Sequence, residues 1–117
     1  MMNALIIDDE MDICYLLSSI LKNSFKTECV NSLADAIIAL QKNSPAVVFL
    51  DNHLPDGMGM DFIAYIKKNS PDTKIIMVTA YDNSSDRNKA LKLGVDFFVG
   101  KPFTKDTIYQ AVDLVSH

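Results

Sequence analysis

Short apolar runs alternate along the chain with longer stretches whose apolar residues recur at helical spacing. The apolar runs are rich in β-branched residues and predict buried strands at 4–7, 26–30, 46–50, 75–78 and 97–99. Alternation of this kind is typical of an α/β fold with a parallel sheet. Because crossovers between parallel strands are right-handed, the helices should cover both faces of the sheet. The pattern therefore predicts five successive βα units.

Polar and turn-forming residues mark the ends of the predicted helices. Ser32 and Thr104 are typical N-cap residues, and Gly94 is typical of a C-cap in the left-handed conformation. The expected helices run over about 11–24, from Ser32 to Asn43, from a loop at 54–57 to Ser70, over about 83–93, and from Thr104 onward.

Length and composition favour one globular domain over residues 1–117, with 49% hydrophobic and 22% charged residues. The formal net charge of −4 argues against direct binding of nucleic acid, which needs a clustered basic surface. No apolar run approaches the ~20 residues that span a bilayer, and no export signal is visible. We therefore expect a cytoplasmic protein that does not bind a membrane.

The chain has two cysteines, Cys14 and Cys29, which lie far apart in the sequence. They form no CxxC motif and no Cys/His grouping, so the sequence suggests neither a disulfide framework nor a zinc site. We expect both to be reduced thiols with a structural role in the core.

Residues whose side chains could take part in binding or catalysis follow four of the predicted strands. Asp8 and Asp9 follow the first strand, Asp51 the third, Thr79 the fourth, and Lys101 the fifth. Ligands of open α/β sheets bind beyond the carboxyl ends of the strands. All five side chains are therefore expected at one edge of the sheet.

This set of residues suits phosphoryl transfer with a divalent cation. Three neighbouring carboxylates repel one another unless a cation intervenes, and oxygen ligands favour Mg²⁺, with Mn²⁺ as an alternative. Lys101 and Thr79 could hold two oxygens of a phosphoryl group. Asp51 could then act as the nucleophile that forms an aspartyl phosphate.

Four segments, LIIDDE, VVFLDNHLPDGMG, IIMVTAY and FFVGKPF, together resemble the receiver domain of two-component response regulators. The resemblance covers essentially the whole chain and agrees in the order, spacing and strand position of the polar residues. It implies a flavodoxin-like, doubly wound sheet of strand order 2-1-3-4-5. It also implies a signalling protein rather than an enzyme, one that catalyses only its own phosphorylation and dephosphorylation.

The resemblance further implies roles for single residues. Asp51 would accept a phosphoryl group from a histidine kinase or a phosphotransfer protein. Asp8, Asp9, Asp51 and the backbone carbonyl of His53 would bind Mg²⁺, with Asp9 as the more direct ligand of the acid pair.

Other positions would carry the response to phosphorylation. Thr79 would bond a phosphoryl oxygen and move inward, and Lys101 would pair with the acyl phosphate, ahead of a cis peptide bond to Pro102. Phe98 would be the aromatic residue that changes rotamer. His53 and Tyr81 occupy the positions that would set the lifetime of the phosphorylated state.

Taken singly, most of these residues have plainer explanations. Phe98 is more often a packing residue than a switch, Glu10 need be no more than an acid in the first turn of a helix, and Asp56 with Gly57 suits a turn. Only the agreement of the whole set favours a functional site.

Three other functions compete with the phosphorylation switch. A receiver-like module that binds partners without phosphorylation conflicts with the intact set of acids, Thr79 and Lys101. A Mg²⁺-dependent phosphohydrolase usually needs a second acid on the nucleophile's strand, where residue 53 is His. A flavin-binding protein needs a phosphate loop where this chain has acids. The expected partner is an output domain or a separate protein, and a homodimer through the last helices is a further expectation for the phosphorylated form.

Overall fold

The computed structural model describes residues 1–80 and 83–116. Its helices are α1 (Met11–Leu21), α2 (Leu33–Lys42), α3 (Gly59–Asn69), α4 (Ser84–Leu93) and α5 (Lys105–Val115). Its strands are β1 (Met2–Ile7), β2 (Phe25–Val30), β3 (Val47–Leu50), β4 (His53–Leu54), β5 (Gly57–Met58), β6 (Lys74–Thr79) and β7 (Phe97–Gly100).

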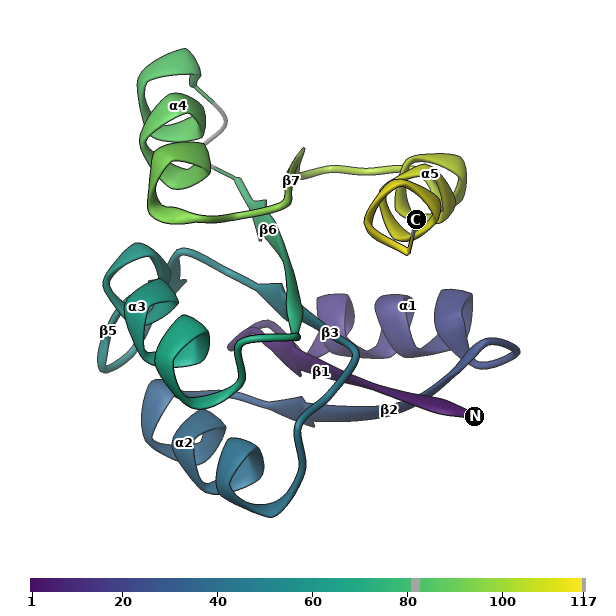
Figure 1. The fold of residues 1–117 in the computed structure, drawn as a ribbon. Helices are drawn as coiled ribbons and strands as arrows, with labels where there is room; N and C mark the ends of the chain where they lie inside the picture. Colours follow the sequence, from purple (N-terminus) through teal and green to yellow (C-terminus); the bar gives the residue numbers. More distant parts are fainter. Residues whose placement is uncertain (81–82, 117) are drawn as a thin grey trace.

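Five of the strands form one parallel sheet in the order β2-β1-β3-β6-β7. Taken in sequence order, these five strands have the order 2-1-3-4-5 that the resemblance implied, so the predicted fold class is confirmed. Figure 1 shows α1 and α5 on one face of this sheet and α2, α3 and α4 on the other.

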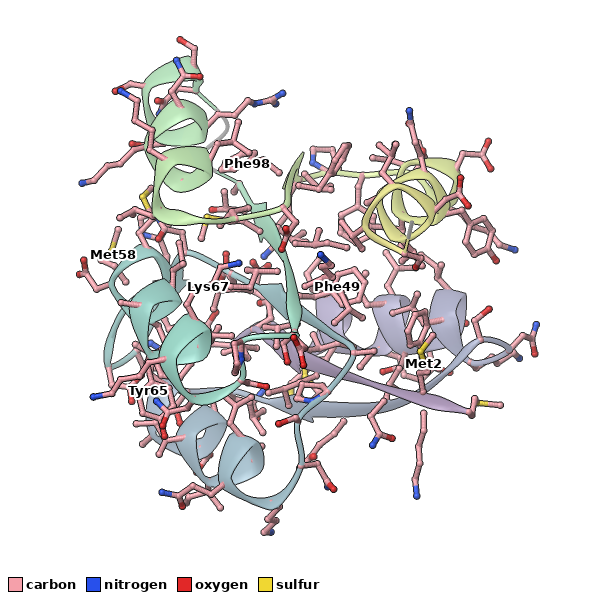
Figure 2. All side chains as sticks on the ribbon, viewed as in Figure 1. Met2, Phe49, Met58, Tyr65, Lys67 and Phe98 are labelled. Carbon is pink, nitrogen blue, oxygen red and sulfur yellow. A yellow bond between two sulfur atoms is a disulfide. The ribbon has the colours of Figure 1, made fainter. Side chains whose placement is uncertain are left out.

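Each face of the sheet has its own hydrophobic cluster, because alternate side chains of a strand point to opposite faces. Phe49 packs toward α1 and α5, in a cluster with Leu17 and Ile108. Phe98 packs on the other face with Ile63 of α3 and Ala90 of α4. Figure 2 shows Phe49 within the sheet and Phe98 beside α4. The central strands are covered on both faces, which explains their continuous apolar sequence.

The predicted helix caps are present. The Ser32 hydroxyl accepts a hydrogen bond from the backbone N–H of Asp35 at 3.1 Å, and the Thr104 hydroxyl accepts one from that of Thr107 at 3.2 Å. Gly94 has a φ of 113° and ends α4 in the left-handed conformation. These caps confirm the predicted starts of α2 and α5 and the predicted end of α4.

Two local expectations need correction. Helix α1 ends at Leu21 rather than near Ser24, because the chain turns directly into β2. The segment expected to be a plain loop at 54–57 belongs to a small antiparallel ribbon, in which His53 pairs with Met58 and Leu54 with Gly57. Turn residues at 55 and 56 are consistent with either arrangement, so the sequence does not distinguish them.

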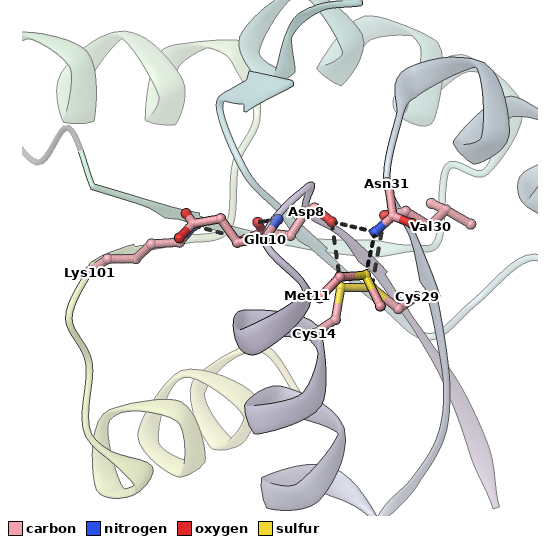
Figure 3. The surroundings of a disulfide bond; sticks show 8 residues. All are labelled: Asp8, Glu10, Met11, Cys14, Cys29, Val30, Asn31 and Lys101. Atoms are coloured by element: carbon pink, nitrogen blue, oxygen red, sulfur yellow. Dashed lines mark hydrogen bonds and ion pairs between the residues drawn. A yellow bond between two sulfur atoms is a disulfide. The ribbon is translucent and has the colours of Figure 1, made fainter. Parts of the chain in front are cut away.

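The expectation for the cysteines is also wrong in this structure. Cys14 on α1 and Cys29 on β2 form a disulfide, with their Cα atoms 6.0 Å apart (Figure 3). The two cysteines are 15 residues apart in the sequence, but α1 packs against the sheet and leads the chain back into β2, beside β1. The contact between them therefore could not be predicted from their spacing.

Within the residues that the structure describes, no helix is both long and apolar enough to cross a membrane.

Candidate functional site

The register of the sheet places the first acids beside Asp51. Ile7 of β1 is paired with Leu50 of β3, so Asp8 and Asp51 leave adjacent strands at the same level. The backbone N–H of Asp51 donates to the carbonyl of Ile7 at 2.9 Å, which continues the ladder to the edge. The predicted convergence at the carboxyl ends of the strands is therefore present.

Among the described residues, Asp8, Asp9 and Asp51 form the one cluster of acids whose geometry could hold a metal ion. One carboxylate oxygen from each lies within 4.8 Å of the others. Asp8 and Asp51 are buried, whereas Asp9 is exposed. Three hard oxygen donors that face one another fit Mg²⁺, which keeps several waters and uses few protein ligands.

Lys101 reaches this cluster from the end of β7. Its ammonium Nζ lies 2.9 Å from Oδ2 of Asp8, 2.9 Å from Oε1 of Glu10 and 3.7 Å from Oδ1 of Asp51. The Lys101 side chain is only 8% exposed, and Asp8 and Asp51 are buried, so water screens these two ion pairs weakly, whereas the Glu10 side chain is 59% exposed. One lysine thus faces several acids and cannot neutralise them all.

Burial and repulsion between the acids raise the pKa values of Asp8 and Asp51. Burial, together with the charge of Asp8, raises the pKa of Asp51 from 3.8 to about 6, although Lys101 and the N–H of Asn52 act against this shift. Burial also raises the pKa of Asp8, in spite of its hydrogen bond from Lys101. The ionised cluster is therefore short of positive charge, which is a condition that a divalent cation relieves.

The pKa of the Lys101 ammonium is also raised, which for a lysine favours the charged form. Burial by itself disfavours its charged form, but hydrogen bonds to Asp8 and Glu10 and the nearby charges of Asp8 and Asp51 raise its pKa overall. Lys101 consequently stays charged at neutral pH and supplies the fixed positive charge of the site.

Thr79 and Lys101 are held together by the backbone. Thr79 is the last residue of β6, is 1% exposed, and pairs with Gly100 of β7. The N–H of Lys101 donates to the Thr79 carbonyl at 2.8 Å. The peptide bond between Lys101 and Pro102 is cis, as the resemblance implied.

The loop that follows Asp51 is fixed by its own polar side chains. Asn52 is buried, and its Oδ1 accepts a hydrogen bond from the N–H of Met60 at 2.9 Å. A Cβ atom at Gly59 would collide with the Asp51 carbonyl oxygen, so α3 can begin close to the site only with glycine at this position. His53 follows in β4, with an exposed side chain.

Asp56, expected to be simple turn chemistry, also contacts another element. Its two carboxylate oxygens accept hydrogen bonds from the N–H groups of Leu33 and Ala34 at 2.9 and 3.0 Å. These bonds lower the pKa of the fully exposed Asp56 carboxyl. Asp56 therefore fastens the β4–β5 ribbon to the first turn of α2.

Of the two aromatic candidates, Phe98 and Tyr81, the structure describes only Phe98. Phe98 is 6% exposed in β7, and the Arg87 guanidinium lies 5.3 Å from the centre of its ring. Its packing between the sheet and α4 agrees with the plainer reading, and the rotamer change remains a prediction. Tyr81 lies outside the described residues.

Two residues next to the acids, Glu10 and Asn52, make contacts at the site that the sequence did not predict. Glu10 shares the Lys101 ammonium with Asp8, and its backbone N–H donates to Asp8 Oδ1 at 2.9 Å. Asn52 links Asp51 to α3. Their positions directly after the key acids are the only signal that the sequence offers for either.

The response regulator receiver domain matches this chain over residues 4–113, and the chain belongs to this family of two-component response regulators. Its strands and acidic site agree with that assignment. The response regulator protein PilR from Pseudomonas aeruginosa is 36% identical over 100 residues, which are 85% of this chain and 22% of PilR. PhoB from Escherichia coli is 29% identical over 95% of this chain and 50% of its own length. The chain thus spans half or less of these two regulators.

Solved structures agree with the sequence relatives. The beryllofluoride-activated NtrC4 receiver domain dimer is 32% identical, with a TM-score of 0.92 over 98% of this chain and 96% of that one. The BeF₃-activated DrrB receiver domain is 25% identical, also with a TM-score of 0.92, over 99% and 97% of the two chains. Receiver domains similar to this chain therefore take up a beryllofluoride-activated state.

Proposed function

We propose that the chain is a phosphorylation switch in which Asp51 accepts a phosphoryl group from a histidine kinase or a phosphotransfer protein. The observation that carries this proposal is the meeting of Asp51 with Asp8, Asp9 and the ammonium of Lys101 at one edge of the sheet. Membership of the receiver family and the activated relatives support it.

The proposed reaction follows from the charges at the site. A carboxylate oxygen of Asp51 attacks phosphorus, and the donor leaves with the electrons of its bond to phosphorus. Mg²⁺, or Mn²⁺, held by Asp8, Asp9, Asp51 and the carbonyl of His53, would neutralise charge on the phosphoryl oxygens. Lys101 would then exchange part of its contact with Asp8 for a phosphoryl oxygen.

The response would begin beside the new anion. The Thr79 hydroxyl, at the end of β6, would bond a second phosphoryl oxygen and draw the following loop inward. Phe98 lies in the neighbouring strand β7, so a shift of that loop would alter the space available to its ring. His53 and Tyr81 would govern the access of water and so the lifetime of the phosphate.

The chain would act as a signalling protein in the cytoplasm and catalyse only its own phosphorylation and dephosphorylation. An output domain or a separate partner would read the altered face. The activated NtrC4 receiver domain is a dimer, which supports a homodimer of this chain on phosphorylation. Light scattering with and without beryllofluoride would measure that association.

The decisive test is incubation with acetyl phosphate and Mg²⁺, followed at once by intact mass spectrometry. We expect a gain of one phosphoryl group that is lost in Asp51→Asn and in the presence of a chelator. Asp72→Asn is a matched control, because Asp72 is an exposed acid just before β6, at the opposite edge of the sheet. A wild type that binds Mg²⁺ but gains no mass and shows no response to beryllofluoride would favour the phosphorylation-independent module instead.

A further inference from the structure

The contact between Cys14 and Cys29 joins two elements that lie next to the acidic site. Their Cα separation of 6.0 Å falls within the roughly 4.4–6.8 Å that disulfides span without backbone movement. The pair therefore needs no rearrangement of α1 or β2 to be closed. Figure 3 shows it directly below Asp8, between the start of α1 and the end of β2.

The two sulfurs differ in their access to solvent. Cys14 is 3% exposed and packs in the cluster below α1. Cys29 is only partly buried, near the end of the edge strand β2. A small reagent would therefore reach Cys29 first, and Cys14 would be the resolving sulfur.

The pair also contacts the backbone that carries the first acid. The Cys14 sulfur lies 3.5 Å from the carbonyl oxygen of Asp8. The residues that follow Cys29 hold the same residue from both sides, because Asn31 Nδ2 donates to the Asp8 carbonyl at 2.9 Å and the Val30 carbonyl accepts from the Asp8 N–H at 3.0 Å. Cys14 itself and the two residues that follow Cys29 thus contact the Asp8 backbone.

We propose that Cys14 and Cys29 form a reversible redox pair, whose closure by a small-molecule disulfide fixes the backbone at Asp8. In cytoplasmic proteins, disulfides are usually transient and serve in sensing or catalysis. Closure would link α1 to the end of β2, the two elements whose residues contact the Asp8 backbone.

The reaction balances as two thiol–disulfide exchanges with oxidised glutathione. The Cys29 thiolate attacks one sulfur of glutathione disulfide, forms a mixed disulfide and releases one reduced glutathione. Cys14 then attacks the Cys29 sulfur and releases the second glutathione. The protein loses two electrons and two protons, and the oxidant gains them.

A fixed backbone at Asp8 should present the acids to a cation with less loss of freedom on binding. The oxidised form would therefore bind Mg²⁺ several-fold more tightly than the reduced form. This consequence rests on the proposed metal site, whereas formation of the disulfide does not.

The redox step is tested by equilibrating the full chain in glutathione buffers of graded ratio, quenching in acid, and counting alkylated thiols by mass. We expect no alkylated thiol in the oxidising buffers, where the disulfide is formed, and two alkylated thiols in the reducing buffers. In Cys14→Ser, oxidation should stop at the mixed disulfide of Cys29 with glutathione. Two alkylatable thiols at every ratio, or a wild type that stops at the mixed disulfide, would overturn the proposal.

The link to the acids is tested by calorimetric titration of Mg²⁺ into both forms. Cys29→Ser is the control, because it keeps the buried Cys14 thiol and cannot close the pair. We expect the oxidised wild type to bind more tightly than the reduced one, and Cys29→Ser to be insensitive to the buffer. Equal affinities of the two wild-type forms would refute the link to Asp8. Absence of Mg²⁺ binding in both forms, with the disulfide present, would instead count against the proposed metal site.

Discussion

Replacement of Asp51 by Asn should stabilise the protein at neutral pH, although it removes the proposed phosphorylation site. The two side chains have the same shape, and an Asn Oδ1 can still accept the hydrogen bond from the N–H of Asn52, which is 2.9 Å long in the wild type. What the change removes is a buried negative charge beside Asp8. That charge is unfavourable in the folded state because burial and repulsion outweigh the attraction of Lys101.

The magnitude follows from the pKa of Asp51, which burial and the charge of Asp8 raise from 3.8 to about 6. This difference corresponds to about 3 kcal/mol between the charged and neutral forms. Above pH 6 the wild type carries the full cost, so Asp51→Asn should raise the melting temperature by about 10 °C at pH 7 without metal.

The stability difference between the wild type and Asp51→Asn should depend on pH. Between pH 3.8 and about 6, the folded wild type binds more protons at Asp51 than the unfolded chain does, so its stability falls as the pH rises through this window. Below the window Asp51 is neutral in both states. The stability gained in Asp51→Asn should therefore be full at pH 7 and close to zero below pH 4.

Calorimetric melting of both proteins from pH 4 to pH 7.5, in chelator and in Mg²⁺, measures this difference. Mg²⁺ should stabilise the wild type more than Asp51→Asn and so reduce or reverse the gap, because it binds the ionised cluster. A variant that is less stable than the wild type at pH 7 in chelator, or a gap that does not change with pH, would refute the argument.

Three further substitutions probe the residues around Asp51, and a fourth, Ser32→Ala, serves as a control. Lys101→Met should destabilise by about 3 kcal/mol in urea unfolding, because it leaves buried acids without their partner, and added Mg²⁺ should recover part of the loss. Gly59→Ala should cost about 2 kcal/mol in the same assay, since its Cβ would collide with the Asp51 carbonyl; unchanged stability would contradict the collision. Asp56→Ala should weaken Mg²⁺ binding in calorimetry, because it frees the loop after Asp51 from α2. Ser32→Ala removes a cap of the same helix without touching that loop, and an equal effect of both variants on Mg²⁺ affinity would show that Asp56 acts only through helix stability.

Much of the fold could be predicted from the sequence because its signals are local. Alternating apolar runs and helical spacing located the five strands of the main sheet, and Ser32, Gly94 and Thr104 marked helix ends through bonds to residues close in the chain. The acids and Lys101 could be placed at one edge because parallel strands bring their carboxyl ends together. The order of the strands came from the resemblance to a family, since an apolar strand pattern does not specify its neighbours.

Only the tertiary structure decided which distant side chains meet. It brought Glu10 to Lys101, Asp56 to the first turn of α2, and Cys14 to Cys29, none of which the sequence analysis anticipated. It also showed that one lysine faces several acids, and that burial raises the pKa of Asp51. Such contacts depend on the packing of helices and loops from different βα units. Periodicity and capping reflect neighbours along the chain, so they determine the elements but not the pairs of residues that the packed elements bring together.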